Sequence, residues 1–507
     1  MPMPGDLADH AAAPPARRAL QDPDVLEIAI LGAGVAGLCM GIQLRKSGFT
    51  RFAILEKSDG VGGTWRDNTY PGSGCDVPSH LYCFSFESKS DWSRAFAEQP
   101  EILRYLEHCA EKYGLLPHLR LNTEIALARF DETLGLWRLT TTAGETISAR
   151  VLVSGTGQLN RPVWPDIPGL ASFPGTTFHS ARWNHEAELA GKKVAVIGNG
   201  ASAIQFIPRI AAKVARLAVY QRSANWMIPK PDREYGRIEQ ALFRHVPGWA
   251  WLYRNYLYLM LEKNFFAFRQ GSWFGRQFLK VTEGQLTQIA DPALRAKLHP
   301  DYPVGCKRIL LSNDYYAALQ LPQIEVVTEA IARIENGSVV TEDGTARPAE
   351  IIILATGFDS LTFLAPMAIE GIGGKPLHEA WRDGAEAYLG LTVPGFPNFF
   401  MLYGPNTNLG HNSIIVMIES QVAYALHCIR AIFDRRLTYL DVKPDAMARF
   451  NEQLQQDIGR SVWAAGCRSW YKTATGKVTN NWSGFTIKYR LETSRVKFED
   501  YRMVAAE

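Results

Sequence analysis

The sequence predicts an α/β protein with two Rossmann-like dinucleotide-binding domains and a helical insert. Two glycine motifs carry this prediction, GAGVAG at residues 32–37 and GNGASA at residues 198–203, and each follows an apolar run typical of a buried strand. A Trp-, Tyr- and Phe-rich stretch at residues 229–304 interrupts the second unit and has the character of helices.

The composition is that of a globular protein. The 507 residues exceed what one hydrophobic core usually supports, so more than one domain is expected. Hydrophobic residues make up 47% and charged residues 21%, values near those of ordinary domains. The net charge of +3 and the lack of a long basic run remove the main electrostatic argument for nucleic acid as a partner.

The seven cysteines form no CxxC pair and no metal-ligand spacing. An odd, scattered set argues against a disulfide framework, so a reducing cytoplasm is the expected compartment and no metal is expected. These residues are Cys39, Cys75, Cys83, Cys109, Cys306, Cys428 and Cys467.

Residues 1–24 are rich in Pro, Ala and Asp and lack the basic start and apolar run of a signal peptide, so a disordered tail is expected. No stretch offers 18 uninterrupted apolar residues, which argues against a transmembrane segment. The nearest approach is residues 249–261, WAWLYRNYLYLML. A helix packed in the protein or over its substrate cleft is the favoured interpretation, and peripheral contact with a membrane surface is the alternative.

The first glycine motif has the context of a nucleotide site. Gly32 allows a tight turn, Gly34 lets a pyrophosphate approach the backbone, and Gly37 lets the helix pack on the strand. Glu56 follows the second strand, about 20 residues after Gly37, where an acid accepts hydrogen bonds from a ribose 2′-hydroxyl. A free 2′-hydroxyl indicates FAD or NAD.

The second motif differs from the first at the residue expected to contact the ribose of the nucleotide. Arg222 stands about 20 residues after Ala203, the offset at which the first motif has an acid. An Arg there pairs with a 2′-phosphate, so this site should prefer NADPH. A surface Arg that merely follows a strand is the alternative.

The loop at residues 62–76, GGTWRDNTYPGSGCD, is dense in Gly, aromatic and turn residues, and it is expected to lie along a planar cofactor. Residues 173–184, FPGTTFHSARWN, space Phe, Gly, His and Trp in a pattern that fits neither a strand nor a helix, so a loop is expected. With both nucleotide motifs in place, Phe173, Gly175, His179 and Trp183 resemble the FxGxxxHxxxW fingerprint of type I Baeyer-Villiger monooxygenases. Asn184 departs from the usual Pro or Asp.

The resemblance implies roles for individual residues. Arg308 would sit over the flavin and stabilise an anionic oxygen, Asp76 would hold the Arg308 guanidinium as a bidentate partner, and His179, on an interdomain linker, would couple domain movement or NADP binding. Lys307 would lie near the NADP phosphate and Trp470 on a mobile loop that touches the nicotinamide cofactor. The full set of expected cofactor-binding residues is Gly32, Gly34, Gly37, Glu56, Gly63, Thr64, Trp65, Asp76, Val77, Tyr82, Gly198, Gly200, Ala201, Ser202, Ala203, Gln205, Arg222, Ser223, Lys307, Arg308 and Trp470.

The same resemblance, with the motif positions, predicts the domain limits. Residues 25–160 and 389–507 would form the FAD-binding domain, residues 161–228 and 305–388 the NADP-binding domain, and residues 229–304 the helical subdomain.

The implied reaction is Baeyer-Villiger oxygenation, in which NADPH reduces FAD and a flavin peroxide inserts one oxygen of O2 beside a ketone carbonyl to give an ester or lactone. A flavin-dependent N- or S-oxygenase is the nearest alternative. A pyridine nucleotide-disulfide reductase would need a redox cysteine pair at the flavin, and a non-catalytic flavin-binding module would have little use for Arg222.

Overall fold

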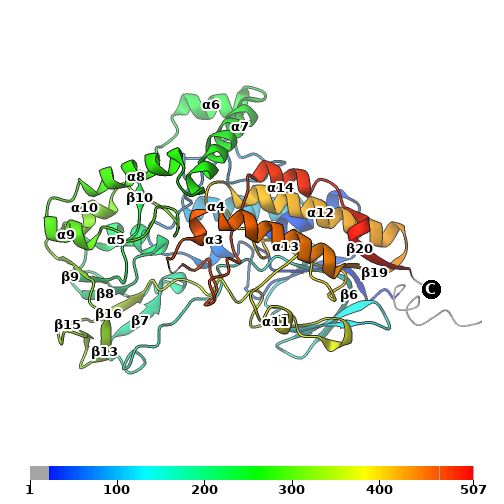
Figure 1. The fold of residues 1–507 in the computed structure, drawn as a ribbon, viewed down its shortest axis with the longest axis horizontal. Helices are drawn as coiled ribbons and strands as arrows, with labels where there is room; N and C mark the ends of the chain where they lie inside the picture. The colour runs from blue at the N-terminus through cyan, green and yellow to red at the C-terminus, as the bar shows by residue number, and fades with distance from the viewer. Residues whose placement is uncertain (1–21, 468, 506–507) are drawn as a thin grey trace, which may run out of the picture.

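The computed structural model describes residues 22–467 and 469–505. Figure 1 shows the molecule as two α/β lobes side by side, with two helices rising above the region between them. The tail expected at residues 1–24 lies outside the described residues except for residues 22–24, which form part of a turn.

The first lobe is built on a mixed sheet whose central strands are buried apolar runs. Its strands are β1 (Leu26–Leu31), β2 (Phe52–Leu55), β3 (Leu119–Arg120), β4 (Ile125–Asp131), β5 (Leu136–Thr141), β6 (Thr146–Ser154), β17 (Ala368–Glu370) and β18 (Phe399–Met401). The order is β17-β4-β5-β6-β1-β2-β3, with β18 also paired to β6. Strand β1 runs parallel to β2 and β6, as a dinucleotide-binding unit requires.

Helices cover this sheet and form its main core. They are α2 (Val35–Lys46), α3 (Thr64–Asp67), α4 (Gln99–Lys112), α12 (Ile414–Asp434), α13 (Pro444–Gly459) and α14 (Thr486–Glu492), with η1 (Leu116–His118), η5 (Val462–Ala464), η6 (Phe498–Asp500) and the β19 (Leu437–Val442)–β20 (Tyr501–Ala505) pair. Helix α12 is long and apolar enough to cross a membrane, but 67% of its most apolar window is buried inside the protein. Because α2 and α12 share one hydrophobic core, α12 is a core helix of this lobe.

The second lobe contains a fully parallel sheet of order β12-β9-β8-β16-β7. Its strands are β7 (Thr176–His179), β8 (Lys193–Ile197), β9 (Arg216–Tyr220), β12 (Ile324–Val327) and β16 (Ile351–Leu354), and its helices are α5 (Ala201–Ile210) and α10 (Tyr315–Leu319). Smaller elements flank it: η2 (Ser180–Arg182), β13 (Ile331–Glu335), β14 (Ser338–Thr341) and β15 (Ala346–Pro348). The predicted pair of Rossmann-like domains is confirmed.

A helical insert leaves the second lobe after β10 (Met227–Ile228) and returns before β11 (Leu310–Leu311), and these two short strands pair with each other. It consists of α6 (Arg237–His245), α7 (Trp249–Glu262), η3 (Lys263–Phe268), α8 (Trp273–Leu286) and α9 (Pro292–Lys297). Helices α6 and α7 are the two that rise above the lobes in Figure 1.

Two stretches differ from the expectations. Residues 173–184 were expected to be a loop on an interdomain linker, but β7 pairs with β16 as an edge strand of the second sheet. Strand β17 pairs with β4, so residues 368–370 join the first sheet although residues 305–388 were assigned to the NADP side. Both strands are short and gain their backbone partners from distant parts of the chain, which no local pattern reveals.

The first glycine turn leaves no room for a side chain at Gly37. A Cβ atom there would stand 1.8 Å from the Gly32 carbonyl oxygen, which is backbone and cannot swing away. We expect Gly37→Ala to lower the free energy of unfolding by about 3 kcal/mol and to reduce FAD content. Thermal unfolding and bound-flavin absorbance measure both effects.

Gly284 in α8 provides the matched control, because nothing lies within 4 Å of a Cβ atom built there. Gly284→Ala should keep or slightly raise stability, by about 0.5 to 1 kcal/mol. A Gly37→Ala protein as stable as the parent would contradict the packing described.

Candidate active site

Both glycine turns hold their first residue in a left-handed backbone conformation, with φ of 92° at Gly32 and 108° at Gly198. Each turn passes directly from a parallel strand into a helix, β1 into α2 and β8 into α5. The two helix N-termini therefore face open space with free amide groups, which suits a pyrophosphate.

A single cavity of about 1120 Å³ connects the two turns. Most of the predicted cofactor residues line it: Gly32, Gly34, Glu56, Gly63, Thr64, Trp65, Asp76, Val77, Tyr82, Gly198, Gly200, Ala201, Ser202, Gln205, Arg222, Ser223, Lys307, Arg308 and Trp470. Gly37 and Ala203, the third positions of the two motifs, do not line it. They are buried between helix and strand, so they shape the turns without facing a cofactor.

The Glu56 carboxylate lies at the end of β2 and is 7% exposed. It accepts hydrogen bonds from the amides of Ala33 (2.7 Å) and Ser58 (2.9 Å). These bonds hold the carboxylate at the first turn, where it faces the cavity with acceptor capacity to spare for a ribose hydroxyl.

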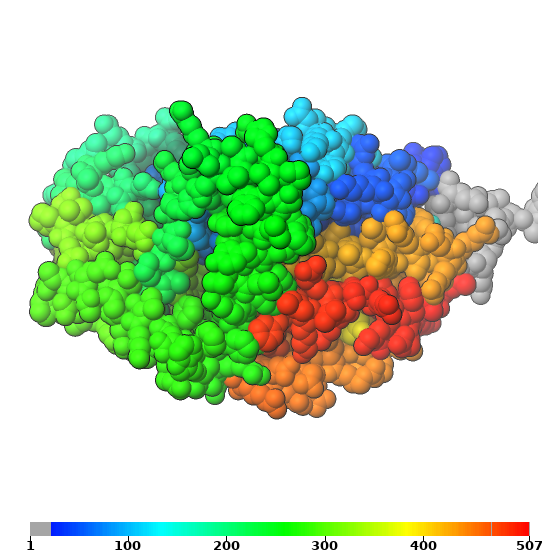
Figure 2. Space-filling model, turned by 90° about the horizontal axis from the view of Figure 1, so that it is seen from above, coloured from blue at the N-terminus to red at the C-terminus, as the bar shows by residue number. Residues whose placement is uncertain are grey.

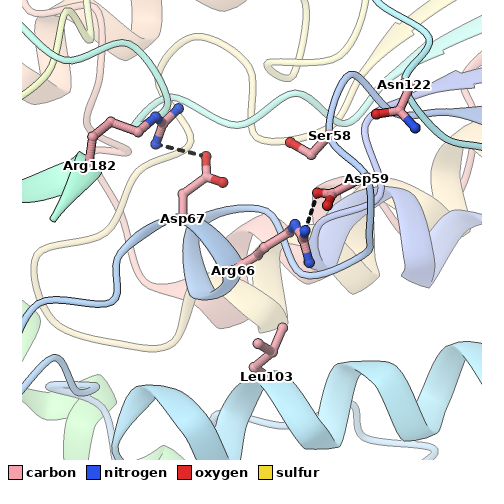
Figure 3. Close-up of a pocket in the computed structure, with 7 residues that line it drawn as sticks. All are labelled: Ser58, Asp59, Arg66, Asp67, Leu103, Asn122 and Arg182. Atoms are coloured by element: carbon pink, nitrogen blue, oxygen red, sulfur yellow. Dashed lines mark hydrogen bonds and ion pairs between the residues drawn. The ribbon is translucent and has the colours of Figure 1, made fainter. Parts of the chain in front are cut away.

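A shallower pocket of about 530 Å³ adjoins this end and shares Ser58 and Asp67 with the larger cavity. Figure 3 shows two ion pairs on its walls, Arg66 with Asp59 and Arg182 with Asp67, the second at 3.2 Å. Arg182 comes from η2 in the second lobe and Asp67 from α3 in the first, so this pair links the lobes beside the cavity.

The loop at residues 62–76 is fixed from the opposite lobe. Gln205 on α5 accepts a hydrogen bond from the Tyr70 hydroxyl (2.9 Å) and donates one to the Gly74 carbonyl (3.0 Å). Within the first lobe, the Trp65 indole donates to the Tyr82 hydroxyl (3.1 Å). Gln205 therefore positions the loop as well as lining the cavity.

Asp76 and Arg308 meet where the two lobes face the same part of the cavity. The Arg308 Nε and Nη2 atoms both donate to Asp76 Oδ2, the Nε bond being 3.2 Å long. The predicted bidentate pair is therefore wrong in detail, because both N–H groups converge on one carboxylate oxygen. The other oxygen is left available to another donor.

The charges of this pair support each other. Burial acts to raise the pKa of Asp76, but the Arg308 charge and hydrogen bonds outweigh it and hold that pKa below its usual value. The Asp76 charge in turn raises the pKa of Arg308. Both side chains therefore stay ionised through the physiological pH range, with the guanidinium about one-third exposed toward the cavity.

Lys307 and Arg222 form a second cationic group on the second-lobe side of the cavity. The Lys307 ammonium donates to the Ser223 hydroxyl (2.7 Å) and lies 4.3 Å from the centre of the Tyr302 ring. Burial, with a further contribution from Arg222, lowers the pKa of Lys307. Two neighbouring cations beside the second glycine turn suit a phosphate better than a hydroxyl.

His179 is the last residue of β7 and does not line the cavity. It is 1% exposed, and its Nδ1 accepts a hydrogen bond from the Ala181 amide at 3.0 Å, which caps η2. Burial lowers the pKa of His179 to about 4, with the backbone of Gly357 acting in the opposite direction. His179 is thus a neutral residue that packs against the turn after β16, where its ring lies 6.1 Å from that of Phe358.

Two tyrosines that were not among the predicted site residues lie beside Arg308. Tyr403 follows β18, lines the cavity and donates a hydrogen bond to Asn408 Oδ1 (2.7 Å). Tyr471 is 1% exposed, and burial raises its pKa to about 12 while Arg308 acts to lower it. The available signal for Tyr403 was its place just after a short buried run, where the carboxyl end of a parallel strand meets a ligand site.

One cysteine pair contradicts the expectation of no disulfide. Cys306 and Cys467 are joined across 161 residues, with their Cα atoms 6.4 Å apart, whereas Cys39, Cys75, Cys83, Cys109 and Cys428 are free and buried. The spacing of the cysteines in the sequence could not reveal this pair, because the two residues come together only when the chain is folded. Neither member is among the residues that line the cavity.

Two dinucleotide turns opening into one cavity, with a cation held between them, define an oxidoreductase that uses a flavin and a nicotinamide nucleotide. The family model described as pyridine nucleotide-disulphide oxidoreductase matches residues 29–242. The chain is 45% identical to a Baeyer-Villiger monooxygenase of Pseudomonas aeruginosa over 94% of this chain and 91% of that protein. It is 44% identical to one of Streptomyces coelicolor over 94% and 93% of the respective chains.

Among solved structures, OTEMO in complex with FAD and NADP matches with a TM-score of 0.84 at 28% identity, covering 94% of this chain and 99% of that one. The chain belongs to the Baeyer-Villiger monooxygenases, as the fingerprint at residues 173–184 predicted.

The buried His179 should make stability depend on pH. Its native pKa of about 4 lies below the unfolded value near 6.5, so its contribution is complete above pH 6.5 and is lost as the pH falls through 4. We expect this residue to account for a loss of up to about 3 kcal/mol across that window. Urea unfolding of the parent and His179→Gln proteins at both ends of the window measures it.

The exposed His245→Gln protein is the matched control and should follow the parent. Identical pH dependence in the parent and the His179→Gln protein would show that His179 is not buried in its neutral form.

Proposed function

We propose that Arg308 and Asp76 form the centre at which this Baeyer-Villiger monooxygenase converts a ketone and O2 into an ester or lactone, using FAD and NADPH. The observation that carries the proposal is the Arg308–Asp76 contact at the junction of the two dinucleotide turns. When bound, the reduced flavin supplies the activated oxygen, and the protein supplies position and charge.

The cavity fits a flavin at its first-lobe end. Gly32, Gly34 and Gly63 line it without side chains, and a Cβ atom on Gly63 would stand only 3.0 Å from the Cα atom of Gly34, so the two backbone segments meet closely at the cavity wall. Gln158 Oε1 is buried at the cavity with no hydrogen-bond partner among the described residues, as expected for a group that accepts from a cofactor.

Arg308 would stabilise negative charge on oxygen during the reaction. A guanidinium stays charged at any working pH, so it can bind an oxyanion throughout without losing its proton. Asp76 is the positioning residue, because it holds the guanidinium through two hydrogen bonds and offsets the cost of burying its charge. Tyr403 and Tyr471 would keep water from the same region.

Arg222 and Lys307 would bind the 2′-phosphate of NADPH, and Trp470 would contact its nicotinamide end. Trp470 lines the cavity, and its carbonyl accepts hydrogen bonds from Asn480 (3.0 Å) and Ser360 (3.2 Å). These bonds support the backbone of the loop while its indole remains at the cavity.

An N- or S-oxygenase is the alternative activity of the same centre, and it is distinguished by products from a ketone and from a sulfide. A disulfide reductase is disfavoured because the Cys306–Cys467 pair does not line the cavity. A purely flavin-binding module is disfavoured by the cationic group at the second turn. The five buried free cysteines support a cytoplasmic location, whereas the disulfide does not.

The Arg308→Ala protein should still accept hydride from NADPH but lose ester formation by about 100-fold or more, because the oxyanion would lose its cation. Anaerobic flavin bleaching and gas chromatography of the product separate the two steps. Arg129→Ala, which removes an exposed Arg paired with Glu370, is the control and should leave both steps unchanged. Normal ester formation by Arg308→Ala would refute the assigned role.

Arg222→Ala should raise the KM for NADPH by about 10- to 100-fold and leave that for NADH nearly unchanged, since only NADPH carries the phosphate that the guanidinium would bind. Steady-state kinetics with both nucleotides provide the measurement. Arg216→Ala, at the start of β9, the strand that precedes Arg222, removes an Arg paired with Glu325 and is the matched control. An unchanged ratio of the two KM values would overturn the 2′-phosphate assignment.

A further inference from the structure

Helix α7 buries polar and charged side chains and exposes apolar ones, the opposite of an ordinary surface helix. Its buried residues are Arg254, Tyr258 and Glu262, which follow one another at four-residue spacing and face the first lobe. The Arg254 guanidinium donates to the carbonyls of His80 (3.0 Å) and Cys83 (2.9 Å). The polar face of α7 therefore packs against the first lobe.

Glu262 anchors the other end of this buried face. Its carboxylate accepts hydrogen bonds from Asn412 Nδ2 (2.7 Å), the Thr486 hydroxyl (2.8 Å) and the Ile487 amide (3.0 Å). Asn412 also lines the cofactor cavity. Because Arg254 in the first half of α7 and Glu262 at its C-terminal end both form hydrogen bonds inside the protein, the opposite face of the helix points outward.

The outward face is apolar and aromatic. Its exposed residues, with their exposed fractions, are Trp249 (42%), Trp251 (63%), Leu252 (55%), Tyr256 (56%), Leu259 (59%) and Met260 (37%). Trp249, Leu252, Tyr256 and Leu259 follow helical spacing, so they form one continuous stripe. Single exposed apolar residues need no explanation, but a continuous stripe of them marks an interaction surface.

Neighbouring elements extend this surface. Helix α14 lies beside α7, where the Tyr258 and Thr486 hydroxyls are 2.8 Å apart, and it exposes Ile487 (41%) and Leu491 (70%). Figure 2 looks onto this side, with the insert in green as a raised band and the α14 segment in red next to it. We call the α7 stripe with Ile487 and Leu491 the apolar face.

The central part of the insert, residues 237–280, is basic. Its exposed cations are Arg237, Arg244, Lys263, Arg269, Arg276 and Lys280. None of them belongs to an ion pair within residues 22–467 and 469–505. Over residues 237–280 the acids are Glu239, which pairs with Arg233, and the buried Glu262. The whole chain carries a net charge of only +3, so this concentration of positive charge is local.

We propose that the apolar face docks on an anionic lipid surface. Exposed Trp, Tyr and Leu side chains with Lys and Arg around them match the interfacial zone of such a membrane. A second copy of the chain fits less well, because a two-fold contact would set the same unpaired cations against each other. A docked α7 would hold the cofactor cavity close to the lipid, where apolar ketones partition.

Vesicle flotation of the FAD-loaded enzyme tests this proposal. Vesicles of phosphatidylcholine with phosphatidylglycerol should bind the protein, and vesicles of phosphatidylcholine alone should bind it weakly. The Leu252→Ser/Leu259→Ser protein should bind about ten-fold or more weakly, and Arg244→Ser and Lys263→Ser about five-fold each. Matched controls are Leu116→Ser on η1, where the exposed fraction is 57%, and Lys375→Ser at an exposed loop.

The proposal would be supported if the Leu252→Ser/Leu259→Ser, Arg244→Ser and Lys263→Ser proteins lost vesicle binding but kept the parental FAD content and NADPH oxidation in free solution. This result would not depend on the chemistry at Arg308. It would be overturned by a parent protein that does not bind anionic vesicles at low salt, or by binding that the two Leu substitutions leave unchanged. Analytical ultracentrifugation showing a dimer that these substitutions dissociate, without vesicle binding, would assign the face to a second copy instead.

Discussion

The ion pair between Asp76 and Arg308 is the contact on which the site depends. Asp76 is the last residue of a loop in the first lobe, and Arg308 follows the helical insert of the second lobe. Their contact therefore requires the two lobes to be correctly placed relative to each other. A guanidinium at a cavity wall is costly without a counter-charge, and removing either partner would leave the other uncompensated. The pair therefore joins the two lobes and keeps a permanent cation at the cavity, as the proposed binding of an oxyanion requires.

Other contacts between the lobes serve the same end. Gln205, on helix α5 of the second lobe, fixes the loop at residues 62–76 of the first lobe, and Arg182 pairs with Asp67 beside the cavity. His179 contributes differently, because its buried neutral ring braces the turn after β16 rather than touching the cavity. The fingerprint stretch at residues 173–184 thus packs on the second sheet through β7 and His179 and contacts the first lobe through Arg182.

The helical insert shows how internal polar contacts can define an external surface. Arg254 and Glu262 satisfy their hydrogen bonds inside the protein, which leaves the aromatic side of α7 facing outward. The sequence showed the mixture of aromatic and charged residues in this helix. It could not show which side would face the solvent, because that depends on the backbone carbonyls of residues 80–83 and on Asn412.

The sequence by itself determined the two nucleotide-binding units, because glycine spacing, the preceding apolar strand and the acid or Arg after the next strand are all local features. It also predicted Arg308 and Asp76 as site residues, through the resemblance of their motifs to one family, and the structure brings the two into contact at the cavity. Tertiary structure alone decided the pairings of β7 and β17, the Cys306–Cys467 bond, the shared carboxylate oxygen of Asp76 and the place of Tyr471 beside Arg308. Each of these contacts joins residues that are far apart in the chain. No local sequence pattern predicts such contacts, because they form only when the lobes fold.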